Sequence, residues 1–138
     1  MGCVELMNLE EEEEPYKGIN NIEVCKNVEK YKEERMRLGR VASYPSGILL
    51  GIMKCYFETY YSKRFLREKL KISSKTLNKV LENKNYIKEY IREICGGEIC
   101  PLEEVLKHVN EFKRMELEGI LRRLGFIKII GGTEYVVL

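Results

Sequence analysis

The sequence predicts a mainly α-helical protein that ends in a small β-hairpin. Apolar residues recur at intervals of three and four over most of the 138 residues, as they do along one face of a helix. The last part of the chain instead has two β-rich runs, 126–130 and 133–138, on either side of Gly131 and Gly132, a pattern typical of a hairpin. A chain of this length forms one domain, or two very small ones that share a core.

The composition favours a binding protein over an enzyme. All 22 acidic residues are Glu, the only histidine is His108, and Asp and Gln are absent. Hydrolase and phosphoryl-transfer sites depend mostly on Asp and His. We therefore expect no catalytic residues, no cofactor, no metal site and no small-molecule substrate. The high Lys and Glu content without Gln is also typical of hyperthermophile proteins.

The first segment, residues 1–18, is expected to be an acidic disordered tail, because Glu10–Glu14 form an unbroken acidic run. It lacks the basic and then apolar order of a signal peptide. The longest apolar stretch, residues 48–61, is interrupted by Lys54 and Glu58 and is too short to span a bilayer. We expect a cytoplasmic protein that does not contact a membrane.

Residues 19–44 are predicted to form an N-terminal helix and a connector. The helix should run from Asn20 to Leu38 and end at Gly39. One face of this helix carries residues spaced by alternating fours and threes, namely Val24, Val28, Tyr31, Arg35 and Leu38. This spacing suits a stripe that packs on the rest of the domain, and it also suits a dimerisation arm.

Residues 45–84 are predicted to form a helix-turn-helix unit. The unit opens with a helix over residues 48–61 that is apolar on nearly every side and should lie in the core. A short helix over 63–71 follows, and a second short helix runs from Ser73 or Ser74 to about Asn83. Their apolar residues are Leu66, Leu70, Ile72, Leu77 and Val80. This spacing places the two helices across one another with a buried residue in the turn.

Residues 85–138 form the last predicted unit. Helices are expected from Tyr86 to Cys95, from Pro101 onward and over 113–124, with a short extended piece at 98–100 and the hairpin at the end. The closing segment, RRLGFIKIIGGTEYVVL, resembles the third helix and wing of the winged-helix family. This resemblance implies that residues 85–138 are a winged helix.

Residues 62–83, SKRFLREKLKISSKTLNKVLEN, resemble the helix-turn-helix core of the same superfamily. In this resemblance, Lys71 occupies the turn position that is usually Gly. The whole chain is similar to small regulators of thermophilic archaea and their viruses. The fold that the resemblance implies is therefore a helix-turn-helix followed by a winged helix.

The cysteines allow two interpretations. The chain has five of them, at Cys3, Cys25, Cys55, Cys95 and Cys100. A tight bend at Gly96-Gly97 would bring the last two within bridging range, and intracellular disulfides do occur in hyperthermophiles. The other interpretation, which we favour, is that the cysteines are small buried apolar residues. Their spacing does not supply the four ligands of a zinc site.

Positive charge is concentrated in the middle of the chain. Residues 62–92 contain ten basic and three acidic side chains. By contrast, residues 1–47 contain seven basic and ten acidic side chains, and residues 93–138 contain six basic and eight acidic ones. The cationic segment coincides with the predicted helix-turn-helix, where contact with nucleic-acid phosphates would require it.

The second short helix carries the candidate DNA-reading residues. Polar side chains outside its apolar stripe, near its N-terminal half, are positioned to contact base edges in the major groove. The predicted base contacts are Lys75, Asn78 and Lys79. The predicted phosphate contacts are Lys63, Arg64, Arg67, Lys71, Ser73, Ser74, Thr76 and Lys84. For Ser73 and Ser74, simple helix capping is an equal alternative.

The sequence thus predicts a sequence-specific double-stranded DNA-binding protein, a transcriptional regulator. Because most such proteins pair half-sites, we expect a homodimer formed through the N-terminal helix or through residues 48–61. The alternative is a protein-interaction subunit of a replication, transcription or RNA-processing assembly, in which the acidic C-terminal unit contacts a partner.

Overall fold

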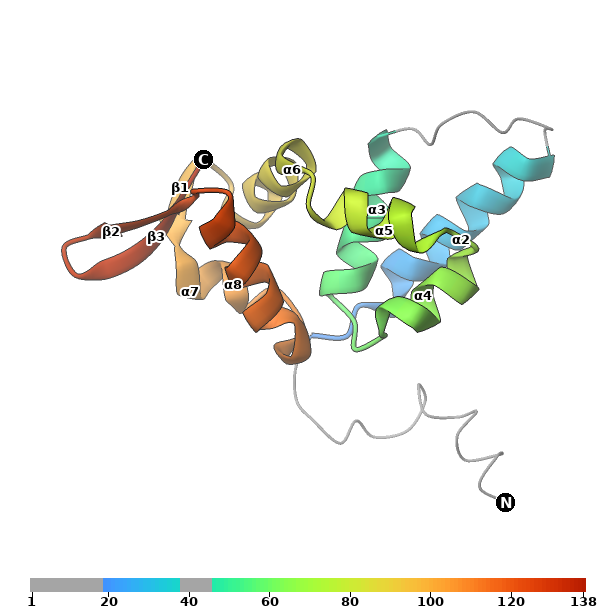
Figure 1. Ribbon diagram of the computed structural model, residues 1–138, viewed down its shortest axis with the longest axis horizontal. Helices are drawn as coiled ribbons and strands as arrows, with labels where there is room; N and C mark the ends of the chain where they lie inside the picture. Colours follow the sequence, from blue (N-terminus) through green and yellow to red (C-terminus); the bar gives the residue numbers. More distant parts are fainter. Residues whose placement is uncertain (1–18, 38–45) are drawn as a thin grey trace, which may run out of the picture.

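The computed structural model describes residues 19–37 and 46–138 (Figure 1). In these ranges the chain forms seven α-helices and a three-stranded antiparallel sheet, which confirms the mainly helical prediction with its C-terminal hairpin. No helix of these ranges is both long and apolar enough to cross a membrane. The predicted acidic tail, the connector and Cys3 lie outside the described residues.

Helices α2 (Ile22–Arg37) and α3 (Ser46–Phe57) cross closely and are joined by a disulfide between Cys25 and Cys55. One helical turn from the disulfide on α3, Gly51 allows the backbones to approach, because a Cβ placed there would lie 2.7 Å from Cγ2 of Val28 on α2. Of the predicted stripe, Val28 is 5% exposed and packs against α3, next to the disulfide-bonded Cys25, whereas Tyr31 is 41% exposed.

The close approach of α2 and α3 gives a stability prediction. Gly51→Ala should lower the free energy of unfolding by about 1–3 kcal/mol, because the steric conflict exceeds the gain in helix propensity. The matched control is Gly119→Ala in α8 (Arg114–Arg123), where a Cβ would meet nothing within 4 Å. That change should stabilise the protein by about 0.5–1 kcal/mol. Urea denaturation measures both, and equal shifts of the two variants would contradict the steric explanation.

Helices α4 (Lys63–Leu70) and α5 (Ser74–Leu81) follow α3 and are each capped by a serine. The Oγ of Ser62 accepts a hydrogen bond from the backbone N–H of Phe65, and the Oγ of Ser73 accepts one from Thr76. Between the two helices, Lys71 has a φ of 54°, the left-handed conformation that glycine usually adopts. The next residue, Ile72, is buried in the turn and fixes the crossing of α4 and α5.

The C-terminal part begins with α6 (Lys84–Cys95), which ends at Gly96 in a left-handed conformation. The bend brings Cys95 to Cys100, and the two form a disulfide. With Cys25 and Cys55 also bridged, the four described cysteines are paired, which differs from the interpretation of the cysteines as simple apolar side chains.

The sheet joins an early strand to the hairpin. Strand β1 (Ile99–Pro101) pairs with β3 (Thr133–Val137), which pairs in turn with β2 (Ile127–Ile130), so that the strand order is β1-β3-β2. The segment between β1 and the hairpin contains α7 (Leu102–Leu106), a 3₁₀ turn η2 (Glu111–Lys113) and α8. Val136 in the central strand is fully buried, so one face of the sheet contributes to the core.

Helix α3 lies at the centre of the core. Ile52, Met53 and Phe57 have no exposed surface, and the buried apolar residues form one cluster that continues past the predicted boundary at residues 84 and 85. Most apolar side chains of residues 48–61 pack inside the monomer, and Leu49, Leu50 and Tyr60 are only partly buried, so the dimer surface predicted on this segment stays a prediction with little apolar surface to support it. The helix is also shorter than predicted, since it ends at Phe57.

Candidate nucleic-acid interface

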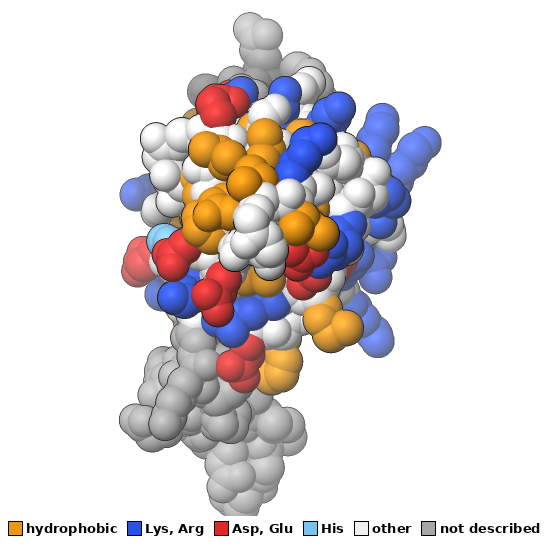
Figure 2. Space-filling view, turned by 90° about the vertical axis from the view of Figure 1, so that its left-hand side faces the viewer, with side chains coloured by type: hydrophobic (Ala, Val, Ile, Leu, Met, Phe, Trp, Pro, Cys, Tyr) orange, Lys and Arg blue, Asp and Glu red, His pale blue; other side chains and the backbone are white. Residues whose placement is uncertain are grey.

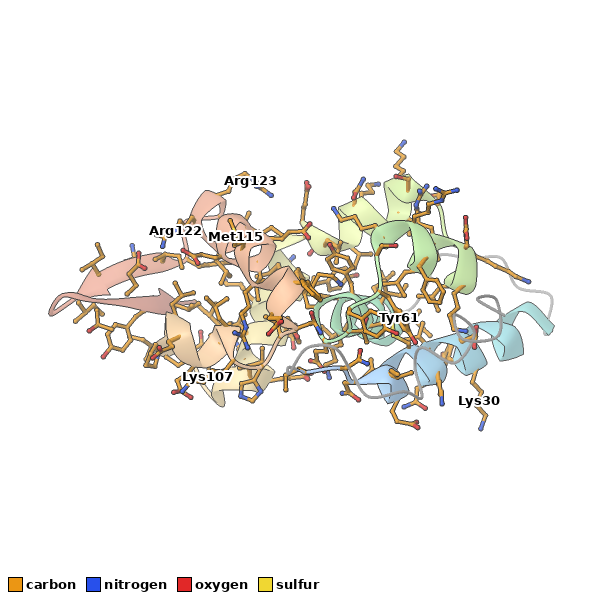
Figure 3. The ribbon with its side chains drawn as sticks, turned by 90° about the horizontal axis from the view of Figure 1, so that it is seen from below. Lys30, Tyr61, Lys107, Met115, Arg122 and Arg123 are labelled. Carbon is orange, nitrogen blue, oxygen red and sulfur yellow. A yellow bond between two sulfur atoms is a disulfide. The ribbon has the colours of Figure 1, made fainter. Side chains whose placement is uncertain are left out.

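Helix α5 turns one face to the core and the other to solvent. Leu77, Val80 and Leu81 are each at most 4% exposed and hold the helix in place. The three predicted base-contacting residues, Lys75, Asn78 and Lys79, are all exposed. Neither lysine forms an ion pair with a described residue. Seen from below, α4 and α5 lie together along one side of the molecule (Figure 3).

The N-terminal turn of α5 combines capping with exposed hydroxyls. The Oγ of Ser73 accepts from the backbone N–H of Thr76 at 3.0 Å and donates to its Oγ1 at 2.9 Å. Ser73 is thus the cap, and its side chain has its hydrogen bonds within the protein. Ser74 is the first residue of the helix and is exposed beside the N–H groups of the first turn. Such a helix start attracts anions.

The predicted phosphate contacts on α4 have different surroundings. Arg64 is exposed and lies 3.6 Å from Glu68, a weak pairing in water, and Arg67 forms no ion pair with a described residue. Lys63 instead lies 3.0 Å from Glu116 of α8 and is a contact between the two halves of the chain. Lys71 is exposed in the turn. The cationic surface is therefore centred on the turn and α5 more than on the start of α4.

Two further cations of the basic segment lie near the two ends of α6. Lys84 is exposed at the start of α6, with its Nζ 5.7 Å from the centroid of the Phe126 ring. Arg92, at the other end of α6, bonds Glu98 at 2.6 Å. The hydrogen bond with Arg92 lowers the pKa of the Glu98 carboxyl. Arg92 therefore stabilises the bend before β1.

Lys113 is buried and holds the end of α3. Lys113 is only 5% exposed. Its Nζ donates to the carbonyl oxygens of Tyr56, Thr59 and Tyr61 at 2.6, 2.9 and 2.7 Å. The same Nζ lies 3.7 Å from the centroid of the Tyr56 ring. Burial lowers the pKa of Lys113 to about 7, and the carboxylate of Glu116 opposes that shift. We call this arrangement the Lys113 cage.

Two more polar groups join α3 to the C-terminal part. The fully buried Asn110 donates two hydrogen bonds. Its backbone N–H donates to the carbonyl oxygen of Phe57 at 2.8 Å, and its side-chain amide donates to the carbonyl oxygen of Ile19 at 2.6 Å. The hydroxyl of Tyr56 donates to Glu116, which also pairs with Lys63. Burial and this carboxylate raise the pKa of Tyr56. The position of α8 relative to α4 and α5 is thus set by a connected polar network.

The hairpin is attached to α8 by Arg122. Its guanidinium bonds Glu118 one turn earlier at 2.6 Å and Glu134 in β3 at 2.8 Å. This hydrogen bonding lowers the pKa of the Glu134 carboxyl. Arg122 therefore has a structural role, whereas its neighbour Arg123 is exposed on the side that α4 and α5 occupy (Figure 3).

Sequence reasoning did not identify the Lys113 cage, Asn110 or the Cys25–Cys55 disulfide. One signal was available for the disulfide, since Cys25 and Val28 on α2 share a helix face, as do Gly51 and Cys55 on α3. Lys113 has no such signal, because its acceptors are carbonyl groups more than 50 residues away.

No protein-family model, curated protein or solved structure matches this chain. Its function is therefore inferred from the placement of its own side chains. In the described ranges no group of three His, Cys, Asp or Glu side chains is placed to hold a metal ion. The exposed cationic face of α5 is the feature with the clearest chemical meaning.

Proposed function

We propose that the protein binds double-stranded DNA in a sequence-specific manner and acts as a transcriptional regulator, with α5 in the major groove. One observation carries the proposal: Lys75, Asn78 and Lys79 are exposed on one side of a short helix whose other side is fixed in the core. A reading helix needs this combination of a rigid mounting and exposed polar side chains of different hydrogen-bonding type.

The chemistry of the three residues suits base recognition. The Lys75 and Lys79 amines donate to the O6 and N7 acceptors of guanine, and the Asn78 amide pairs with the N6 and N7 edge of adenine. The first turn of α5, with exposed Ser74, and the cationic turn before it supply phosphate contacts that fix the helix in the groove.

The element order supports the winged-helix interpretation of residues 85–138. The sequence of elements is α6, β1, α7, α8, β2 and β3, and β1 completes a sheet with the hairpin. In this interpretation α8 is a second helix on the DNA side, where Arg123 supplies a secondary contact. The hairpin carries one basic residue, Lys128, and is a minor contributor to phosphate binding.

The alternative, a protein-interaction subunit, is favoured by apolar side chains exposed on the C-terminal part. Met115 is 87% exposed and Ile129 is 71% exposed. Contiguous exposed apolar surface often marks a protein contact. A DNA-binding regulator also uses such contacts, so we place DNA binding first.

Salt dependence of duplex binding tests the proposal. We expect affinity for a mixed-sequence duplex to fall by about 0.9 log units per log unit of salt for each phosphate neutralised, with roughly three to five phosphates contacted by the α4–α5 surface. Selection from a random duplex pool should then enrich one consensus. Fluorescence anisotropy measures the slope. A chain that binds no duplex even at low salt would support the protein-interaction alternative instead.

A further inference from the structure

The sheet has an outer face that is largely apolar. Because side chains alternate along a strand, Thr133, Tyr135 and Val137 and the residues paired with them lie on the side opposite the buried Val136. The side chains of this outer face are Ile99, Pro101, Lys128, Ile130, Thr133, Tyr135 and Val137. Ile99 and Ile130 are 52% and 49% exposed, although both are large and apolar.

This face lies at the end of the molecule and beside the cationic surface. Viewed from the sheet end, hydrophobic side chains gather near the centre, while many Lys and Arg side chains project along the right-hand edge (Figure 2). That edge corresponds to the side that α4 and α5 occupy in Figure 3. The sheet end of the molecule and the cationic side therefore point in different directions, and a contact at the sheet end leaves the cationic side open.

We infer that the outer face of the sheet packs against the same face of a second copy of the chain. A two-fold contact places a surface against itself, so it suits a face with little charge. Among the described residues of this face the only charged one is Lys128, whose long side chain can reach solvent at the rim. A strongly acidic or basic partner would find no complementary charges here.

The position of the sheet at one end of the molecule also suits a pair of DNA-reading subunits. A two-fold axis parallel to the direction in which α5 faces solvent leaves both copies of α5 on one side of the dimer. A duplex lying along that side would then contact both helices, as half-site recognition requires. This use of the dimer rests on the proposed function, but the contact itself does not. It replaces the dimer surface predicted at residues 48–61.

The test compares three forms of the full chain by sedimentation equilibrium. The native chain should form a reversible dimer. Changing Ile99→Lys and Ile130→Lys together should weaken dimerisation about 100-fold or more, because central apolar contacts are lost and like charges meet across the two-fold axis. Both residues are half-exposed in the monomer, so we expect the fold to survive, as circular dichroism will show.

The matched control is Ile129→Lys, which makes the same change in the same strand. Ile129 is 71% exposed but pairs with Glu134, whose carboxylate binds Arg122 of α8, so it faces the other side of the sheet. This variant should dimerise as the native chain does. A native chain that stays monomeric, or equal weakening by Ile129→Lys and the double change, overturns the inference.

DNA binding is measured on the same proteins so that the two proposals can fail separately. A monomeric double variant that still binds a single half-site, with lower affinity for a full site, supports both. A native dimer that binds no duplex supports the sheet contact and contradicts the DNA-binding function. A native monomer that binds duplex supports the DNA-binding function and contradicts the sheet contact.

Discussion

Replacing Lys75 and Lys79 together by Ala should weaken binding to the selected duplex by about 2–6 kcal/mol, which is at least 30-fold, and should flatten the salt dependence. Both side chains are exposed on α5, and neither pairs with a described carboxylate, so their charge is available to DNA. Their removal leaves the core untouched. Fluorescence anisotropy titrations at two salt concentrations measure the loss.

The matched control removes the same charge from the opposite side of the molecule. Lys30 and Lys107 are exposed and lie away from α4 and α5 (Figure 3). Their joint replacement by Ala should change affinity less than about threefold, because distant exposed charges are screened by salt. Equal losses from the two pairs would show a non-specific charge effect. Comparable losses on replacing Arg122 and Arg123 would instead place the main DNA contact on α8.

Lys113→Met should lower the free energy of unfolding by about 3 kcal/mol or more. The change keeps an apolar stem but removes the donor that satisfies three buried carbonyl oxygens, and an unsatisfied buried acceptor costs about 1–3 kcal/mol. Because the cage lies between α3 and the start of α8, we expect the loss to affect the whole cooperative transition. Urea unfolding followed by circular dichroism measures it.

The control for this prediction is Lys107→Met. Lys107 is exposed, and its ion pair with Glu104, at 3.4 Å, is one turn away on the surface. Such pairs contribute little, so the change should stay within about 0.5 kcal/mol. Equal stability of the two methionine variants would contradict this prediction. It would mean that the three hydrogen bonds from Lys113 to carbonyl oxygens only offset the cost of burying its charge.

Short-range sequence patterns predicted the structural features that depend on contacts between residues close in sequence. The serine caps, the buried Ile72 and the hairpin around Gly131-Gly132 depend on residues close in sequence, and their positions were predictable. The exposure of the polar face of α5 followed from the apolar stripe on its other side. The helix-turn-helix and winged-helix interpretation, and DNA binding itself, stay predictions.

Long-range polar contacts caused the errors. Residues 48–61 have the apolar composition of a continuous helix, yet α3 ends at Phe57. The carbonyl groups of Tyr56, Thr59 and Tyr61 accept from Lys113, and that of Phe57 accepts from Asn110. Helical periodicity contains no information about a partner more than 50 residues away. The dimer surface was likewise predicted on a helix whose apolar side chains mostly pack inside the monomer, against α2, α5 and α6.

The continuous core has a consequence for attempts to dissect this protein. The buried cluster runs from Cys25 in α2 to Val136 in β3, with α3 at its centre. A fragment cut after residue 84 would leave the apolar side of α3 open to water, and residues 85–138 alone would lose the carbonyl groups that surround Lys113. Neither fragment should fold by itself, so the parts of the chain before and after residue 84 form one folding unit.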